Sequence, residues 1–192
     1  PVFHALLGAP PGHADDGRLT VQIERLARVE QAYVPGTAVL RTVQYDDAGQ
    51  SIELIDFAPR FEHHGRTFRP AQLVRRIRPL EGHPRIRVGV RPRGEWGATA
   101  PTLTRGSNHV RYVLPDGTLR LTTNVPPSYV LDGTWFSLST PMSLIFGPDE
   151  TASNRLDAVN PAWVKTPSIL RFCGSTEAVK PEMPASRAAS AR

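Results

Sequence analysis

Apolar and polar residues alternate in repeated short runs within the first 150 residues, which is the pattern of half-buried β-strands. The longest alternating segment contains two such runs, residues 37–45 and 51–57, on either side of a polar turn at residues 46–49. A proline stands before the first run and after the second, where it marks the end of a strand. The segment predicts a β-hairpin with a loop of four or five residues that anchors a sheet.

The alternation changes phase inside the second run of this hairpin. Ile52 and Leu54 have one parity, whereas Ile55 and Phe57 have the opposite one. A β-bulge near Leu54 and Ile55 would keep all four side chains inside, so we predict a bulge there.

Seven further runs alternate in the same way and bring the total to nine. The second and third of them flank a turn at residues 80–84 and are predicted to pair, whereas residues 60–70 are predicted to form a polar connection. A single helical turn is expected at residues 3–8, and no sustained amphipathic helix follows before residue 150. Short strands with Gly/Pro turns predict an all-β fold, an antiparallel β-sandwich or barrel. The seven runs are residues 19–23, 73–79, 85–90, 110–114, 119–123, 136–138 and 142–146.

The pattern divides the chain near residue 150. Residues 1–150 are predicted to form one β-sandwich domain, since 192 residues suit a single substantial core. Residues 151–192 are rich in Pro, Ala and Ser and have no sustained period. They predict a weakly ordered tail, with disorder from about residue 177.

The composition limits the kinds of bond, metal site and cellular location that the chain is expected to have. Cys173 is the only cysteine, so an internal disulfide and a multi-cysteine zinc site are excluded. No run of 18 apolar residues exists, and the first residues lack the basic region and apolar core of a signal peptide. A cytoplasmic protein without a membrane partner is the expectation.

Carboxylates are the first candidates for chemistry, because a glycosidase needs two across a sugar-binding cleft. Asp56 and Glu95 stand out, the latter because Trp96 beside it would stack on a sugar ring. Each acid also has a simpler interpretation, a turn or rim residue bonded locally, and no pair is assigned. The candidates are Asp56, Glu62, Glu81, Glu95, Asp116, Asp132, Asp149 and Glu150.

Metal binding, catalysis by serine and nucleotide binding have less support in the sequence. The adjacent His63 and His64 would point to opposite faces of an extended chain, and neither they nor His83 and His109 have metal-ligand spacing. Ser107 and Ser128 lack the context of a catalytic serine, and no nucleotide-binding loop is present. No metal, cofactor or catalytic residue is therefore assigned.

Seven arginines between residues 75 and 93 raise the question of nucleic acid, and the chain carries a net charge of +5. Single-strand binders interleave such arginines with exposed aromatic residues, and this stretch does not. The solvent face of a sheet is the favoured interpretation, and no nucleic-acid partner is expected. The residues are Arg75, Arg76, Arg78, Arg85, Arg87, Arg91 and Arg93.

Several short motifs follow one another in the first 151 residues. They are YVPGTAVL (33–40), IDFAP (55–59), LVRR (73–76), GSNH (106–109), LTT (121–123), SYVL (128–131) and FGPDET (146–151). In this order they resemble the N-terminal domain of glycoside hydrolase family 15, the bacterial glucoamylase and trehalase-like enzymes. Collinear blocks are far more specific than any single motif.

The resemblance implies a β-supersandwich joined to an (α/α)6 barrel, whose two glutamates hydrolyse α-glucosidic bonds of glucans or trehalose. The barrel sequence would begin after Thr151, where this chain instead has its Pro-rich tail. Trp163 is the only residue of that tail that faintly resembles the family sequence. No catalytic residue is carried over, because the positions that would hold them are absent. We therefore expect a non-catalytic domain, a fragment of such an enzyme, that is inactive alone.

A second hypothesis belongs to a different class. The chain would be a stand-alone module that binds carbohydrate or a separately encoded barrel. Trp96, Trp135 and Tyr129 would be its aromatic platforms, although core packing is an alternative role for each. Calorimetric titration with glucans separates the two hypotheses.

Overall fold

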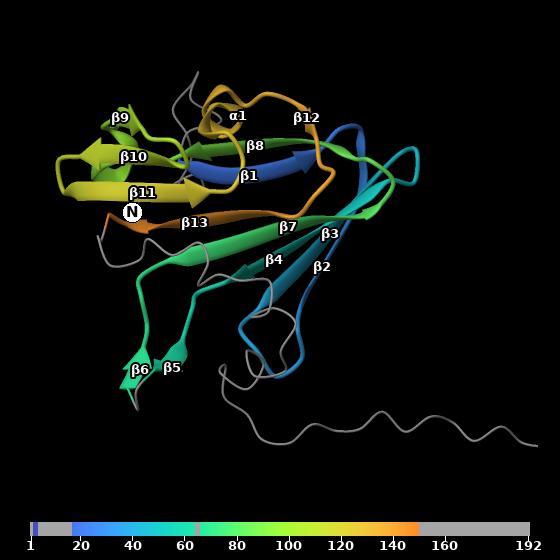
Figure 1. Ribbon diagram of the computed structural model, residues 1–192, viewed down its shortest axis with the longest axis horizontal. Helices are drawn as coiled ribbons and strands as arrows, with labels where there is room; N and C mark the ends of the chain where they lie inside the picture. Colours follow the sequence, from blue (N-terminus) through green and yellow to red (C-terminus); the bar gives the residue numbers. More distant parts are fainter. Residues whose placement is uncertain (1, 4–16, 64–65, 150–192) are drawn as a thin grey trace, which may run out of the picture.

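The computed structural model describes residues 2–3, 17–63 and 66–149, and it confirms an all-β, sandwich-like fold. A large antiparallel sheet of eight strands lies under a small sheet of three (Figure 1). The order in the large sheet is β2 (Leu26–Tyr33), β3 (Leu40–Asp46), β4 (Ser51–Phe57), β7 (Leu73–Glu81), β13 (Met142–Pro148), β11 (Gly117–Thr123), β10 (His109–Leu114) and β9 (Thr102–Arg105). The small sheet has the order β1 (Arg18–Ile23), β8 (Arg85–Arg91) and β12 (Phe136–Ser137), and a separate hairpin joins β5 (Phe61–His63) to β6 (Arg66–Phe68).

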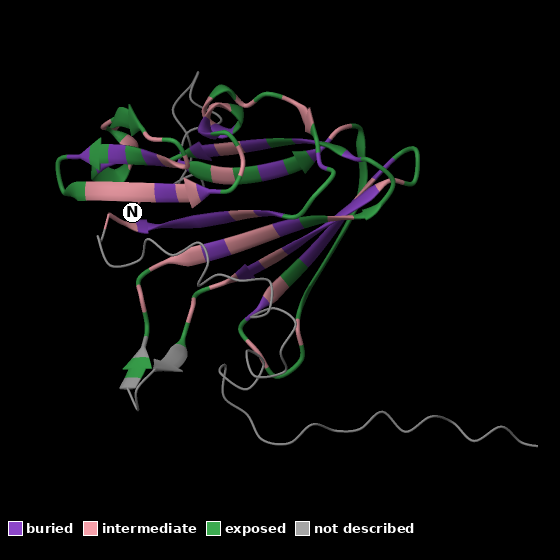
Figure 2. Ribbon diagram, in the orientation of Figure 1, coloured by how far each residue is buried: buried purple, intermediate pink, exposed green. Residues whose placement is uncertain are grey.

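The core lies between the two sheets, where alternate residues of the facing strands are buried (Figure 2). Ile86 and Val88 of β8 enter it from the small sheet, while Leu54, Ile77 and Leu144 enter it from the large sheet. This is the arrangement that the period-two pattern predicts, because each strand turns every second side chain inward.

Two polar side chains tie the sheets together inside this core. Gln44 of β3 accepts a hydrogen bond from the Ile23 amide and donates one to the Val21 carbonyl, both on β1 and both at 2.9 Å. The Tyr112 hydroxyl of β10 donates to the Val90 carbonyl of β8 at 3.1 Å. Burial raises the pKa of Tyr112 above its ordinary value, so the hydroxyl stays a donor.

The predicted hairpin is present as β3 and β4, although β3 begins at Leu40 rather than residue 37. Its turn is built around Asp46, whose Oδ1 accepts hydrogen bonds from the amides of Ala48 (2.9 Å) and Gln50 (2.7 Å). Gly49 takes a φ of 83°, a conformation that glycine adopts without a steric penalty. Turn chemistry of this kind is local, which explains why the sequence predicts it.

The predicted bulge near Leu54 and Ile55 is wrong. The β3–β4 register runs without interruption across both residues, so Ile55 lies on the face opposite Leu54. The phase change has another cause: β4 carries apolar residues on both faces. The register irregularity of this strand lies elsewhere, between Ser51 and Ile52 in its pairing with β7.

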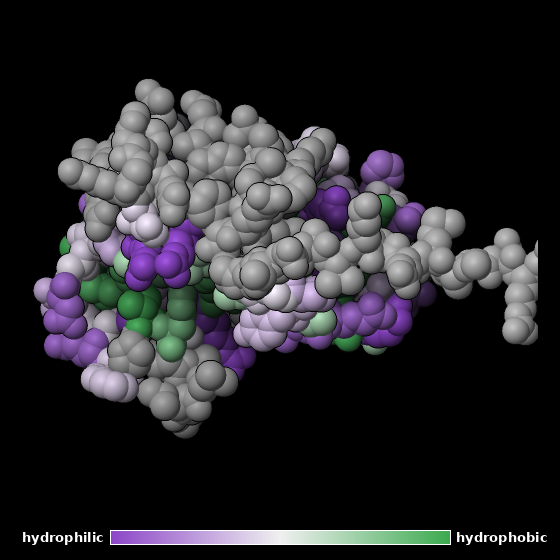
Figure 3. Space-filling model, turned by 90° about the horizontal axis from the view of Figure 1, so that it is seen from below, coloured by the Kyte–Doolittle hydropathy of each residue, from purple (hydrophilic) through white to green (hydrophobic). Residues whose placement is uncertain are grey.

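The outer face of the large sheet explains why both sides of β4 are apolar. Val43, Val74 and Ile145 are buried but lie outside the main core cluster, and their register places them on the face turned away from the small sheet. Seen from below, a hydrophobic patch lies on the described part of the molecule beside hydrophilic residues (Figure 3). The large sheet therefore has two apolar surfaces.

The predicted pairing of residues 73–79 with 85–90 is also wrong. β7 pairs with β4 and β13 in the large sheet, whereas β8 pairs with β1 and β12 in the small one. The chain thus crosses from one sheet to the other at residues 82–84. Alternation reports which side chains of a strand are buried, but not which strand is its neighbour.

Several elements were not predicted. β2, β5, β6 and β9 are additional strands, a short helix α1 (Pro127–Asp132) lies against β8, and a 3-10 turn η2 spans Glu95–Gly97. Every residue of β2 and β9 is exposed, so neither strand shows the alternation of buried positions that reveals the others. Residues 4–8 of the predicted helical turn and the whole tail at 151–192 lie outside the described residues.

None of the helices within the described ranges is long and apolar enough to cross a membrane. The cytoplasmic location remains a prediction.

Candidate functional site

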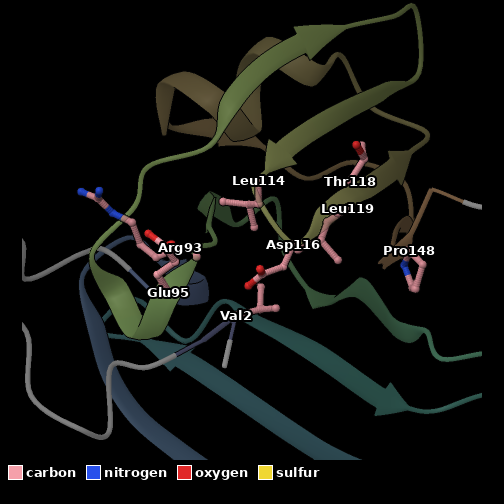
Figure 4. Close-up of a pocket in the computed structure, with 10 residues that line it drawn as sticks. Val2, Arg93, Glu95, Leu114, Asp116, Thr118, Leu119 and Pro148 are labelled. Atoms are coloured by element: carbon pink, nitrogen blue, oxygen red, sulfur yellow. The ribbon is translucent and has the colours of Figure 1, made fainter.

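A pocket of about 270 Å³ opens where the segment after β8 meets the β10–β11 turn (Figure 4). Arg93 and Glu95 lie on one side of it, and Asp116 comes from the turn. Two candidate carboxylates that are 21 positions apart in the sequence thus share one pocket. The remaining lining residues are Val2, Gly94, Leu114, Gly117, Thr118, Leu119 and Pro148.

The pocket combines an apolar floor with convergent polar groups, as small-molecule sites commonly do. Leu114, Leu119 and Pro148 supply apolar surface, while the carboxylates of Glu95 and Asp116 accept hydrogen bonds. Both of these acids are exposed to solvent. They therefore lack the enclosed surroundings of the general acid of a glycosidase.

A tight loop contains Glu95, which lines the pocket, and Trp96, which follows it in the chain. Gly94 and Thr99 form an isolated bridge, and the Gly97 amide donates to the Gly94 carbonyl at 2.9 Å. Glu95 and Trp96 have φ values of 47° and 59°, a left-handed conformation that costs free energy in residues with a Cβ. The Thr99 hydroxyl donates to the Glu95 carboxylate and holds it at the loop.

The loop leaves Trp96 74% exposed. The other two predicted platforms are partly used by the protein itself. The Tyr129 ring packs on Phe136 with centroids 4.9 Å apart, and the Arg87 guanidinium covers Trp135 at 5.0 Å. Among these three predicted platforms, Trp96 therefore has the ring that is most accessible to solvent.

Asp56 has a structural role rather than a place in the pocket. Its Oδ1 and Oδ2 accept hydrogen bonds from Nε and Nη2 of Arg75 at 2.6 and 2.7 Å. The Arg75 Nη1 also donates to the Leu19 carbonyl of β1 at 3.3 Å. Because the two side chains are only 11% and 17% exposed, this bidentate pair ties the large sheet to the small one.

Glu53 is a buried carboxylate that sequence reasoning did not single out. On the outer face of the large sheet it lies between Arg41, whose Nε is 2.6 Å from Oε1, and Arg78, which contacts Oε2. Burial raises the pKa of Glu53, but hydrogen bonds and charge from Arg78 and Arg41 outweigh it and bring the pKa below its ordinary value. Alternation gives no signal of its burial, because Glu53 stands between the inward-facing Ile52 and Leu54 and is therefore expected on the outer face.

Glu53→Gln is expected to destabilise the fold by roughly 1–2 kcal/mol at pH 7, a modest effect because both guanidiniums are about half exposed. Because the pKa of Glu53 is lowered, the charged pair stabilises the fold fully above the ordinary glutamate pKa, and this contribution is lost as the pH falls from that value through the lowered pKa. The difference from wild type should therefore shrink between pH 7 and pH 3. Urea denaturation at both pH values measures it.

Glu81→Gln on β7 is the control, since this glutamate is exposed. It should leave stability within about 0.5 kcal/mol of wild type at both pH values. A Glu53→Gln effect that did not shrink with acid would contradict the electrostatic role.

The remaining acids are dispersed. Asp149 pairs with Arg111 at 2.8 Å and Arg120 at 3.5 Å, while Glu81 and Asp132 are exposed. The structure does not describe the side chain of Glu62, and Glu150 lies outside the described residues.

Among the described residues, the candidate histidines and serines do not converge on a site; the side chain of His63 is not described, and His64 lies outside the described residues. His83 is exposed, and His109 lies near Arg111 and Arg120. Burial lowers the pKa of His109, and the two arginine charges lower it further. Ser107 is exposed in a turn, and Ser128 lies in α1. In the described ranges, no three His, Cys, Asp or Glu side chains gather as metal ligands.

The arginine stretch is divided between the two sheets. Arg75 and Arg78 pair with buried carboxylates on the large sheet, whereas Arg85 pairs with Glu24 on the small sheet at 3.0 Å. The exposed Arg85 fits the interpretation of the stretch as the solvent face of a sheet, whereas Arg75 does not, because it lies on the face turned toward the small sheet. The absence of a nucleic-acid partner stays a prediction.

Comparison of the chain with known protein families, curated proteins and solved structures found no match.

Proposed function

We propose that this chain is a non-catalytic, carbohydrate-binding β-sandwich domain of the α-glucoside hydrolase lineage, which works beside an α-helical catalytic barrel. The observation that carries the binding function is the exposed Trp96, which directly follows Glu95 in the chain, and Glu95 lines a pocket together with Asp116. An exposed indole face stacks on the apolar face of a sugar ring, and carboxylates accept hydrogen bonds from its hydroxyl groups.

The strained loop supports this proposal. Left-handed φ angles at two consecutive residues other than glycine persist only where the surrounding structure holds them, and such strain clusters at functional sites. Here the Gly94–Thr99 bridge and the Thr99 hydroxyl hold the loop, and the result is an indole turned to solvent.

The lineage rests on the motifs that resemble family 15, and an antiparallel sandwich is the architecture that this resemblance implies. The proposed ligands are therefore α-glucans or trehalose. A purely binding role is favoured because the candidate carboxylates whose side chains the structure describes are either exposed or paired with arginines, as in Glu95 and Asp56.

Titration calorimetry with maltooligosaccharides and trehalose tests the binding function. Wild type should release heat with at least one of these sugars, and Trp96→Ala should weaken binding at least about fivefold, since aromatic contacts of this size contribute of the order of 1–3 kcal/mol. Trp135→Phe is the matched control and should bind as wild type does. Absence of heat with every sugar would contradict the proposal.

A turnover assay on the same sugars tests the non-catalytic part separately. We expect no glucose release by the isolated chain. Robust turnover would overturn this part of the proposal while leaving sugar binding in place.

A further inference from the structure

β2 is an open edge of the large sheet. It pairs with β3 on one side, and no described strand pairs with it on the other. All eight of its residues are exposed. An edge of this length presents a row of unpaired backbone donors and acceptors, which is a template for another strand.

The hydrogen-bond phase shows which backbone groups face outward. The Val34 amide donates to the Val39 carbonyl at 2.9 Å, one step beyond the ladder between β2 and β3. Hydrogen-bonded and non-hydrogen-bonded pairs alternate along an antiparallel ladder. The amide and carbonyl of Val29 and Gln31 therefore point away from β3, toward the free edge.

The charges of β2 are arranged symmetrically about Val29, with Arg28 before it and Glu30 after it. If two copies of β2 pair antiparallel about Val29, Arg28 of each copy stands opposite Glu30 of the other. Both side chains are about half exposed and lie on one face, where they already pair within the strand at 2.5 Å. This edge is thus complementary in charge to itself.

The apolar residues of β2 support the same partner. Among the described residues, eight large hydrophobic side chains are exposed, and Leu26, Val29 and Tyr33 are three of them. Pairing about Val29 sets the Val29 side chains of the two copies against each other, in a cross-strand contact that removes apolar surface from water.

We propose that the chain forms a two-fold symmetric homodimer in which two β2 strands pair antiparallel about Val29 and join the large sheets of both copies. Such an interface uses the same patch on each subunit and closes on itself. The partner is a second copy of this chain, and the proposal is independent of the sugar-binding function.

Light scattering after size-exclusion chromatography tests the proposal. Wild type should elute with twice the mass of one chain, and Val29→Pro should be a monomer with an unchanged circular dichroism spectrum, because proline removes the outward amide. The matched control is Leu103→Pro on β9, the other edge of the sheet, where the Gly106–His109 hydrogen bond places the Leu103 amide outward as well. The exposed fractions of the two residues are 49% and 48%, and Leu103→Pro should remain a dimer.

A charge exchange tests the register without proline. Arg28→Glu and Glu30→Arg should each weaken the homodimer at least tenfold, because like charges then face each other across the axis. An equimolar mixture of the two variants should form a heterodimer, since glutamates of one copy meet arginines of the other. Both variants lose the pair within the strand, so a purely internal role predicts no recovery on mixing.

A monomeric wild type would overturn the proposal and leave the edge to a different partner. Dimeric Val29→Pro, or a mixture of the charge variants that stays monomeric, would also overturn it. If Val29→Pro fails to fold, the charge exchange decides alone.

Discussion

Asp56→Ala is expected to destabilise the fold by about 3–5 kcal/mol, because it leaves the Arg75 guanidinium buried without a counter-charge. The same change removes the carboxylate that orients the Arg75 guanidinium, so we expect the hydrogen bond from Arg75 to the Leu19 carbonyl of the small sheet to weaken as well. Urea denaturation followed by circular dichroism measures the free energy of unfolding. The loss should be accompanied by a melting temperature several degrees below that of wild type.

Glu24→Ala is the control for this prediction. Glu24 and Arg85 form another cross-strand pair of a carboxylate and an arginine, but their side chains are 38% and 51% exposed. An exposed pair of this kind contributes at most about 1 kcal/mol. Equal effects of the two substitutions would show that the burial of Asp56 does not determine its contribution.

The double variant Asp56→Leu with Arg75→Leu shows whether the instability of Asp56→Ala comes from the unpaired charge of Arg75 or from altered packing at this position. Replacement of a buried ion pair by apolar residues is often close to neutral. The double variant should therefore recover most of the stability that Asp56→Ala loses. If it stays as unstable as the single variant, the geometry around this position matters more than the unpaired charge.

Gly147→Ala is the second substitution with a large expected effect, about 1–3 kcal/mol. A Cβ at Gly147 would stand 2.8 Å from the Ala71 carbonyl oxygen and 2.8 Å from Cγ of Gln72. The first of these atoms belongs to the backbone, so relief requires β13 to move in the middle of the large sheet. Thermal unfolding of the variant measures the cost.

Gly89→Ala is a matched change in a strand of the small sheet. Its Cβ would meet only the Thr20 hydroxyl, at 3.0 Å, which rotates away. We expect a change within about 0.5 kcal/mol. A variant of Gly89 that is as unstable as Gly147→Ala would show that loss of glycine from a strand, rather than the clash with the backbone, is responsible.

The sequence predicts the fold class and most strands because alternation and turn chemistry are local properties. Asp46 and Gly49 mark their turn through their own backbone preferences. Partners of strands are not local, so the pairing of β7 with β13 rather than β8 is invisible in either segment. β2 escapes prediction for a different reason: its exposed position leaves no buried face to alternate with a polar one.

The site was predictable in part. Glu95 with Trp96 was recognised from the adjacent residue types, and Asp116 was considered as a separate turn residue. The fold brings Glu95 and Asp116 to one pocket, which depends on where the β10–β11 turn lies relative to the segment after β8. Glu53 was missed because nothing in the chain indicates that two arginines from neighbouring strands flank it.

The place of β13 determines when the large sheet can form during synthesis. It is the last described strand of the chain, yet it lies between β7 and β11 and is the only strand that joins the two halves of the sheet. A ribosome-bound chain that has not yet released residues 142–148 holds two separate half-sheets with open edges. Such edges attract other chains, so we expect incomplete chains that lack this strand to be prone to aggregation.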